Sequence, residues 1–145
     1  GKAAEIAAAD IPNRVVRLTA LRDRLFKGLE ERIPDTIVNG HPSKRLPQNV
    51  NVSFLYVEGE SMLLFLNMDG IYVSSGSACT SRSLKSSHVL SCIGTDAAAA
   101  NGTLLLTLGT GTTNEDVEYV LEKLPPIVQR LRDMSPLYED VVKKR

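Results

Sequence analysis

One cysteine of this chain lies among residues too small to build a core around it. Residues 74–81 read Ser-Ser-Gly-Ser-Ala-Cys-Thr-Ser and follow the short apolar stretch 70–73. A packed cysteine behaves as a small hydrophobe and normally has bulky apolar neighbours. We therefore predict that Cys79 lies on a mobile, exposed loop, where a thiolate can attack a partner group and carry it away. The loop alone leaves a reactive and a merely exposed cysteine equally open.

Three polar residues beyond Cys79 could assist such a thiol. Arg82 and Lys85 are close enough in sequence to favour a thiolate, although both fit a solvated polar face equally well. His88 could form a Cys–His pair, but a surface or helix-capping histidine is the better interpretation.

The remaining candidates favour structural roles. Cys92 is expected in the core, on the same side of a short helix as Val89 and Ile93. His41 lies in a proline-flanked turn and is interpreted as structural. The two cysteines and two histidines are not clustered at ligand spacing, so we predict no metal site. The Gly-Thr-Gly-Thr run at 109–112 could receive a phosphate, but it lacks the lysine of a phosphate-binding loop and is interpreted as a strand-to-helix turn.

Composition excludes several classes of protein. The 145 residues suit a single domain, predicted to span 1–145, and 17 basic residues balance 17 acidic ones, so no charge excess favours nucleic acid. No apolar run approaches the roughly 20 residues of a membrane span, and no signal-peptide pattern is present. Two cysteines fit a reducing compartment, either cytoplasm or mitochondrial matrix. The start at Gly1 inside a helical pattern indicates an excised or split piece.

Hydrophobic periodicity predicts an α+β fold. A helix is expected over 3–33, kinked or divided at Pro12 with Asp10 capping its second part. A second long helix should begin at the Thr113 capping box and bend at Pro125 and Pro126. Between them the pattern predicts short helices at 59–68, 87–93 and 97–100, and strands at 36–38, 50–54, 71–73 and 103–108. We expect a small, mostly antiparallel sheet with the long terminal helices on one face, and the 103–108 strand covered on both faces.

Several of these segments, taken in order, resemble the C-terminal third of NifS/IscS-type cysteine desulfurases. The Ser-Ser-Gly-Ser-Ala-Cys-Thr-Ser loop is highly specific for the branch of that family with a long catalytic loop, here 74–87. The other segments are Asn-Gly-His-Pro at 39–42, Arg-Leu-Pro at 45–47, Asn-Val-Asn-Val-Ser-Phe at 49–54, Val-Glu-Gly-Glu-Ser at 57–61 and Leu-Arg-Asp-Met-Ser-Pro-Leu at 131–137.

The resemblance implies a division of labour between two domains. A large domain, absent from this chain, would hold pyridoxal phosphate on a lysine, and a small domain like this one would supply the cysteine. The cofactor would act as an electron sink for L-cysteine. Cys79 would take the substrate sulfur as a persulfide, release L-alanine and deliver the sulfur to an acceptor such as an iron–sulfur scaffold protein. Members of the family are homodimers.

Three departures from the family pattern bear on activity. The family's cofactor lysine lies in a Ser-x-His-Lys context that this sequence lacks, so no cofactor-binding residue is assigned. Asn101 and Leu105 stand where the family carries His and Arg, and Thr110 and Gly111 stand where it carries Arg and an aromatic residue. The family's Arg is expected to pair with the substrate carboxylate, which Leu105 cannot do. We favour a loss of substrate recognition over drift or engineering of a fragment.

Three hypotheses about function follow. In the first, the chain is the cysteine-bearing half of a desulfurase, active only beside a cofactor domain. In the second, it is an inert module that docks a desulfurase or a sulfur acceptor. In the third, Cys79 is a thiol carrier that works without pyridoxal phosphate. The missing lysine argues against turnover by the chain alone.

Overall fold

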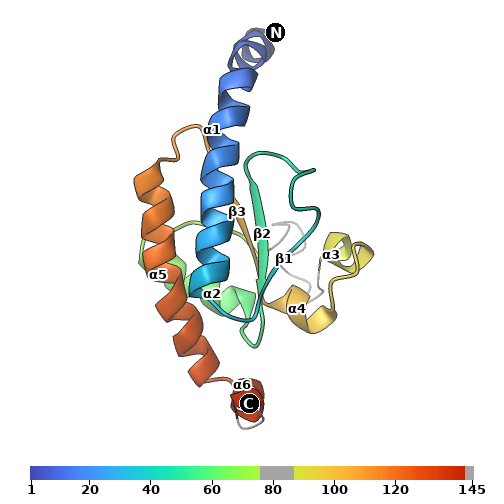
Figure 1. Ribbon diagram of the computed structural model, residues 1–145, viewed down its shortest axis with the longest axis vertical. Helices are drawn as coiled ribbons and strands as arrows, with labels where there is room; N and C mark the ends of the chain where they lie inside the picture. Colours follow the sequence, from blue (N-terminus) through green and yellow to red (C-terminus); the bar gives the residue numbers. More distant parts are fainter. Residues whose placement is uncertain (76–86, 143–145) are drawn as a thin grey trace.

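Long helices pack on one face of a small sheet (Figure 1). The computed structural model describes residues 1–75 and 87–142, with side chains through 139. Within these ranges the elements are, in order, α1 (Lys2–Arg32), β1 (Thr36–Val38), β2 (Asn49–Phe54), α2 (Gly59–Met68), α3 (His88–Cys92), α4 (Ala97–Asn101), β3 (Thr103–Thr107), α5 (Asn114–Asp133) and α6 (Pro136–Val142).

The described strands form one antiparallel sheet in the order β1-β2-β3. Val52 of β2 pairs with Val38 on one side and with Leu104 on the other. Successive side chains of a strand point to opposite faces, so Val50, Val52 and Phe54 share one face while Asn51 and Ser53 share the other. The sheet therefore has an apolar face and a polar face.

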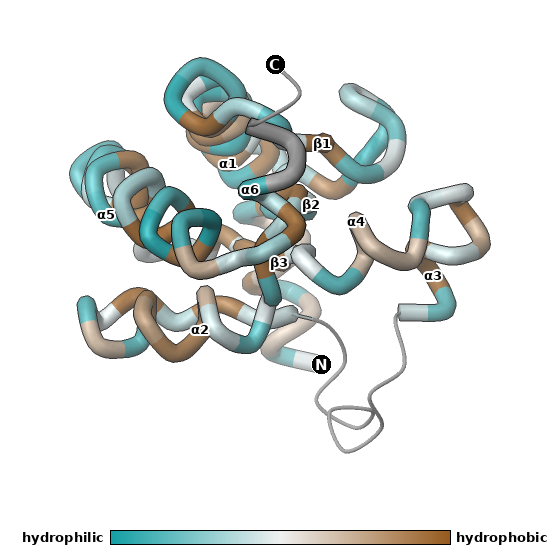
Figure 2. The backbone as a smooth tube through the Cα atoms, turned by 90° about the horizontal axis from the view of Figure 1, so that it is seen from below, coloured by the Kyte–Doolittle hydropathy of each residue, from teal (hydrophilic) through white to brown (hydrophobic). Residues whose placement is uncertain are grey.

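Helices cover the two faces unequally. Figure 2 shows α1, α2 and α5 on one side of the sheet and the short α3 and α4 on the other. The apolar face and its helices form the core, which includes Leu21, Leu25, Leu29, Val50, Val52, Phe54, Met62, Leu66, Leu104, Leu106, Val117, Leu121, Leu124 and Val128. The predicted α+β class, with both long helices on one face, is confirmed.

The first long helix is continuous, so of the two predicted alternatives at Pro12, a kink or a division, the division is wrong. Asp10 does not cap a second segment but accepts a hydrogen bond from Arg14 one turn further on, at 2.6 Å from Nη2. A proline removes one backbone donor, and a long helix tolerates that loss by bending. Figure 1 shows the first turns tilted away from the axis of the remainder.

The second long helix also continues through its prolines. Thr113 and Asp116 form the predicted capping box, in which each side chain accepts the other residue's backbone N–H. The helix runs unbroken through Pro125 and Pro126, because Leu124, Ile127 and Val128 are buried on either side of them. The following helix α6 was not predicted.

A buried arginine ties the end of α5 to two turns. Arg132 is 1% exposed, and its guanidinium donates to the carbonyl oxygens of Leu55, at 3.1 Å, and Pro34, at 2.8 Å. It also lies 5.5 Å from the ring centre of Tyr138 in α6. The Leu-Arg-Asp-Met-Ser-Pro-Leu segment thus has a structural role that the sequence analysis did not assign.

Two glycines permit close approach between elements. A Cβ at Gly102 would lie 2.2 Å from the carbonyl oxygen of Phe54, so the chain between α4 and β3 can press against the end of β2. A Cβ at Gly28 would lie 2.4 Å from Cδ1 of Leu121, where α1 crosses α5. Both contacts require the absence of a side chain.

Candidate functional site

The segment that carries Cys79 joins the described fold at the edge of β3 and at the start of α3. Cys79, Arg82 and Lys85 lie outside the described residues, so their predicted roles remain predictions. The structure describes both attachments of the segment, at Ser74 and Ser75 on one side and at Ser87 on the other.

The first attachment is an isolated bridge to β3. The backbone N–H of Ser74 donates to the carbonyl oxygen of Leu105 at 3.1 Å, and Leu105 N–H donates back to Ser74 at 2.6 Å. The predicted strand at 71–73 does not form, because only Ser74 pairs with β3. Ile71 is buried against the core, whereas the next residue, Tyr72, is 82% exposed. The approach to the loop is therefore an extended segment held at its end.

The second attachment is the start of α3. The carbonyl oxygen of Ser87 accepts from Ser91 N–H at 3.1 Å, and the serine hydroxyl makes no cap bond. Leu90 is buried, and its carbonyl accepts from Thr95 N–H at 3.0 Å. Helix α4 follows, with the carboxylate of Asp96 accepting from Ala98 N–H at 3.3 Å. Both ends of the Cys79 segment are thus connected to β3, one by pairing and one through α3 and α4.

Leu105 lies at the first of these attachments, paired with Ser74. Leu104 and Leu106 are buried on the apolar face, so Leu105 points to the polar face and is only half-buried. The prediction that this strand is covered on both faces is wrong, since Leu105 and Thr107 retain exposure. Asn101 and the Thr110–Gly111 pair are exposed. The structure therefore pairs position 105 with Ser74, at the described start of the Cys79 segment.

Cys92 does not enter the core, which contradicts the prediction. It is an exposed, free thiol, and Val89 and Ile93 on the same helix are also more than half exposed. The helix α3 is one turn long and packs through Leu90 alone, so its other side chains face solvent. His88 is exposed at the first position of α3.

Two structural interpretations are supported. The Nδ1 atom of His41 accepts the backbone N–H groups of Ser43, at 3.1 Å, and Lys44, at 3.0 Å, which fixes the turn. The 109–112 run is a strand-to-helix turn in which Thr112 Oγ1 accepts from Gly109 N–H at 2.8 Å. Arg17 donates to the carbonyl oxygens of this turn. A turn that presents carbonyl oxygens to a cation is not arranged to hold a phosphate.

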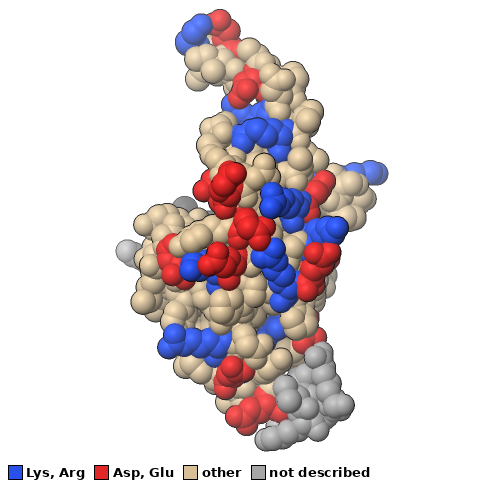
Figure 3. Space-filling model, turned by 60° about the vertical axis from the view of Figure 1, so that its left-hand side comes forward, with Lys and Arg blue, Asp and Glu red and all other residues tan. Residues whose placement is uncertain are grey.

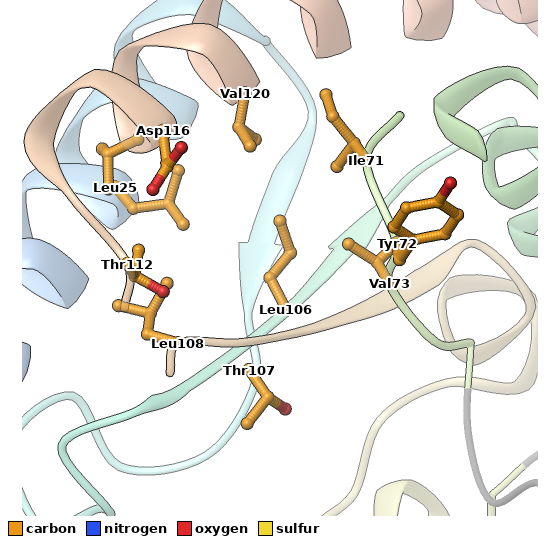
Figure 4. A pocket seen from close by; sticks show the side chains of 11 residues that line it. Leu25, Ile71, Tyr72, Val73, Leu106, Thr107, Leu108, Thr112, Asp116 and Val120 are labelled. Atoms are coloured by element: carbon orange, nitrogen blue, oxygen red, sulfur yellow. The ribbon is translucent and has the colours of Figure 1, made fainter. Parts of the chain in front are cut away.

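A pocket of about 160 Å³ lies between the 71–73 segment, β3 and α5 (Figure 4). Ile71, Leu106 and Val120 line it with apolar groups. The carboxylate of Asp116 is engaged with its own helix terminus, where it accepts Thr113 N–H at 2.8 Å. Among its described lining residues the pocket has no lysine or arginine, so it offers an apolar contact rather than an anion site.

Charged side chains form local pairs of opposite sign rather than a large surface region of one charge. Figure 3 shows basic and acidic residues interspersed over the face it draws. Glu118 on α5 accepts from Arg32, at 2.6 Å, and from Arg24, at 3.1 Å, both on α1. The hydrogen bond from Arg32 lowers the pKa of the Glu118 carboxyl below its ordinary value, with a smaller contribution from Arg24. These contacts link α1 to α5.

The described residues do not fit a metal or pyridoxal phosphate. Over 1–75 and 87–142 no three Cys, His, Asp or Glu side chains group as a metal site. The cofactor needs a lysine beside a cavity, yet in the same ranges Lys2, Lys27 and Lys44 are exposed and Lys123 lies 3.3 Å from Glu122 on the surface of α5. No helix within the described residues is long and apolar enough to span a membrane.

Residues 2–120 match the family model described as Aminotransferase class-V. The chain is 50% identical over its whole length to the cysteine desulfurase IscS of Clostridium botulinum and covers 37% of that protein. It is 56% identical to the IscS of Methanosarcina thermophila over 94% of its length, which is 34% of that protein. A solved NifS-like protein aligns with a TM-score of 0.76 and 28% identity, covering 90% of this chain and 32% of that one. The chain thus spans about a third of the length of its relatives.

Proposed function

This chain belongs to the class-V aminotransferase family, and on that premise we propose that it supplies the sulfur-accepting cysteine of a cysteine desulfurase. Cys79 is the catalytic residue of this proposal. The observation that carries it is the attachment of the Cys79 segment: its described start, Ser74, pairs with Leu105 of β3, and its described end, Ser87, begins α3, on the side of the sheet away from the long helices. The proposal requires that the thiol of Cys79 reach both a substrate-binding domain and an acceptor protein.

The proposed step transfers one sulfur atom. The thiolate of Cys79 attacks the sulfur of L-cysteine, forming an S–S bond, while the C–S bond of the substrate breaks. The electron pair of that bond stays on the substrate carbon, which takes a proton and leaves as L-alanine. Cys79 becomes a persulfide, and its outer sulfur passes to the thiol of an acceptor that serves iron–sulfur cluster assembly.

The family is dependent on pyridoxal phosphate, which the described residues do not fit. When bound, this cofactor supplies an electron sink at the substrate carbon. We infer that it is contributed by a large domain outside this chain, and that the chain does not turn over L-cysteine alone. We also propose that the protein is located in the cytoplasm.

A persulfide assay tests the function. The Cys92→Ser variant removes the other thiol, which is exposed, so that any sulfur atom gained is bound to Cys79. We would incubate it with L-cysteine, with and without a cofactor-loaded desulfurase whose own loop cysteine is replaced by alanine, and measure the gain of one sulfur atom by mass spectrometry. We expect a persulfide only with the partner, and none in the Cys79→Ser, Cys92→Ser double variant.

The other hypotheses predict different outcomes. Because no lysine in the described ranges suits the cofactor, a thiol carrier independent of pyridoxal phosphate is the second candidate. A persulfide formed from thiosulfate without any partner would favour that function. A Cys79 that gains no sulfur under either condition would favour an inert docking module.

A further inference from the structure

A buried hydrogen-bond network on the polar face of the sheet is centred on Asn39. This residue follows β1 and is 4% exposed. Its Nδ2 donates both hydrogens, to Oδ1 of Asn51 and to Oγ of Ser53, each at 2.8 Å. Its Oδ1 accepts the hydroxyl of Thr95 at 3.3 Å. Every side-chain hydrogen of Asn39 is therefore committed, which fixes the orientation of the amide.

The network continues from Ser53 in one direction. Thr103 donates its single hydroxyl hydrogen to the carbonyl oxygen of Ala99 at 3.2 Å. Oγ of Ser53 lies 2.6 Å from Oγ1 of Thr103, so the hydrogen between them belongs to Ser53. Ser53 is 0% exposed and Thr103 is 1% exposed. A directed relay thus runs from Asn39 through Ser53 and Thr103 to a backbone carbonyl of α4, and such chains strengthen cooperatively.

The relay attaches one unit of the fold, residues 87–101, which we call the α3–α4 arm. Of its side chains only Leu90, Ala99 and Ala100 are buried, so little apolar area holds it. Two polar attachments reach the arm from the sheet, at Thr95 and at the carbonyl of Ala99, and both lead back to Asn39. The arm begins at Ser87, where the Cys79 segment ends.

We propose that Asn39 is a positioning residue, which sets the placement of the α3–α4 arm and hence the C-terminal attachment of the Cys79 segment. The effect of Asn39 on sulfur transfer rests on the proposed function of Cys79. Its effect on the placement of the arm does not. Without the relay the arm retains the packing of Leu90, Ala99 and Ala100 and loses its fixed orientation on the sheet.

Matched variants at Thr103 test the relay. Thr103→Val keeps the size and shape of the side chain and removes the hydroxyl, whereas Thr103→Ser keeps the hydroxyl and removes a methyl group. Amide hydrogen exchange would be followed in the arm and in α1 and α5 of the full chain. We expect Thr103→Val to speed exchange in the arm roughly tenfold to a hundredfold, with α1 and α5 unchanged. Thr103→Ser should exchange as the original chain does.

A second variant cuts the other attachment. Thr95→Val should speed exchange near 95 to a smaller extent, because one longer hydrogen bond is lost. Ser61→Ala, which removes a surface hydrogen bond to Glu58 on α2, is the control that should leave the arm unaffected. Equal exchange in Thr103→Val and Thr103→Ser, or an equal acceleration in the arm, α1 and α5, would overturn the inference.

Exchange needs no cofactor or sulfur donor, so this result is independent of the persulfide assay. If Cys79 of the original chain accepts sulfur, Thr103→Val should slow that transfer and Thr103→Ser should restore it. Unchanged transfer in Thr103→Val, with the arm loosened, would reject the link to the Cys79 segment while leaving the proposed function intact.

Discussion

The two faces of one sheet are joined to their helices by different forces. On the apolar face, Val50, Val52 and Phe54 are fully buried under α1, α2 and α5, and stability there comes from removing apolar area from water. On the polar face, directed hydrogen bonds hold the α3–α4 arm. Apolar packing tolerates small shifts, whereas hydrogen bonds fix distance and direction. The face with the weaker cover is the one that carries the α3–α4 arm, at whose first residue the Cys79 segment ends.

The largest effect is expected on the apolar face. Phe54→Ala should lower the free energy of unfolding by about 3–5 kcal/mol, because a buried ring leaves a cavity. Urea denaturation followed by circular dichroism measures this loss. Leu64→Ala, on the exposed side of α2, is the control and should change stability by about 0.5 kcal/mol or less. Similar losses at the two positions would contradict the assignment of the core.

The next effect concerns activity at the polar face. If Leu105 has replaced a carboxylate-binding arginine, Leu105→Arg beside a complementing large domain should raise desulfurase activity, since such a contact contributes about 2–5 kcal/mol of binding. L-Alanine release measures the change. Leu105→Lys restores charge without the bidentate geometry and should recover less. Activity that stays the same in Leu105→Arg would count against the hypothesis of lost substrate recognition.

A smaller loss of stability is expected from the relay itself. Ser53→Ala leaves the Nδ2 donor of Asn39 without its acceptor and removes the hydrogen bond to Thr103 Oγ1, which should cost about 1–3 kcal/mol in urea denaturation. Adding Thr103→Val also breaks the bond to Ala99, but because both single variants lose the Ser53–Thr103 bond, the double variant should lose less than the sum of the two single losses. If the double variant were less stable than the sum of the two single changes predicts, the relay would not be the source of the effect.

The smallest effect is expected at the surface, between α1 and α5. Because Arg32 lowers the pKa of Glu118 in the folded chain, this carboxylate stabilises the fold above its ordinary pKa of about 4.3. That contribution disappears as the pH falls through the lowered value. Glu118→Gln should therefore flatten the acid side of the stability profile and change neutral-pH stability less than any variant above. An unchanged acid limb in thermal denaturation would argue that the pairs with Arg24 and Arg32 contribute nothing.

The elements with strong local signals were predictable from sequence. The helix at 59–68, the Thr113 capping box and the strands at 36–38 and 50–54 follow from periodicity and capping chemistry, and the structure confirms them. The strand at 71–73 failed because its apolar residues are used for contact with the core and the pocket rather than for pairing. Cys92 failed because a one-turn helix has too little surface to bury more than one side chain.

The candidate site was predictable in part. The small residues around Cys79 predict a loop, which lies outside the described residues, and the contacts of its described ends, Ser74 and Ser87, depend on tertiary structure. The polar network was missed, although its signal was present: Asn51 and Ser53 alternate with Val50 and Val52 along one strand. If Asn51 and Ser53 are interpreted as buried under a second layer rather than exposed to solvent, a polar network on that face is predicted. Arg132 gave no such signal, because its carbonyl partners come from turns distant in sequence.

The close contacts around Gly102 disfavour a shift in the register of β3 relative to β2. A shift of β3 by one residue along β2 would carry Asn101 or Thr103 into a space that has no room for a Cβ. Such a slip would also turn Leu104 and Leu106 toward the hydroxyl-rich side and Leu105 into the core. The close packing around Gly102 therefore restricts β3 to the observed register on β2.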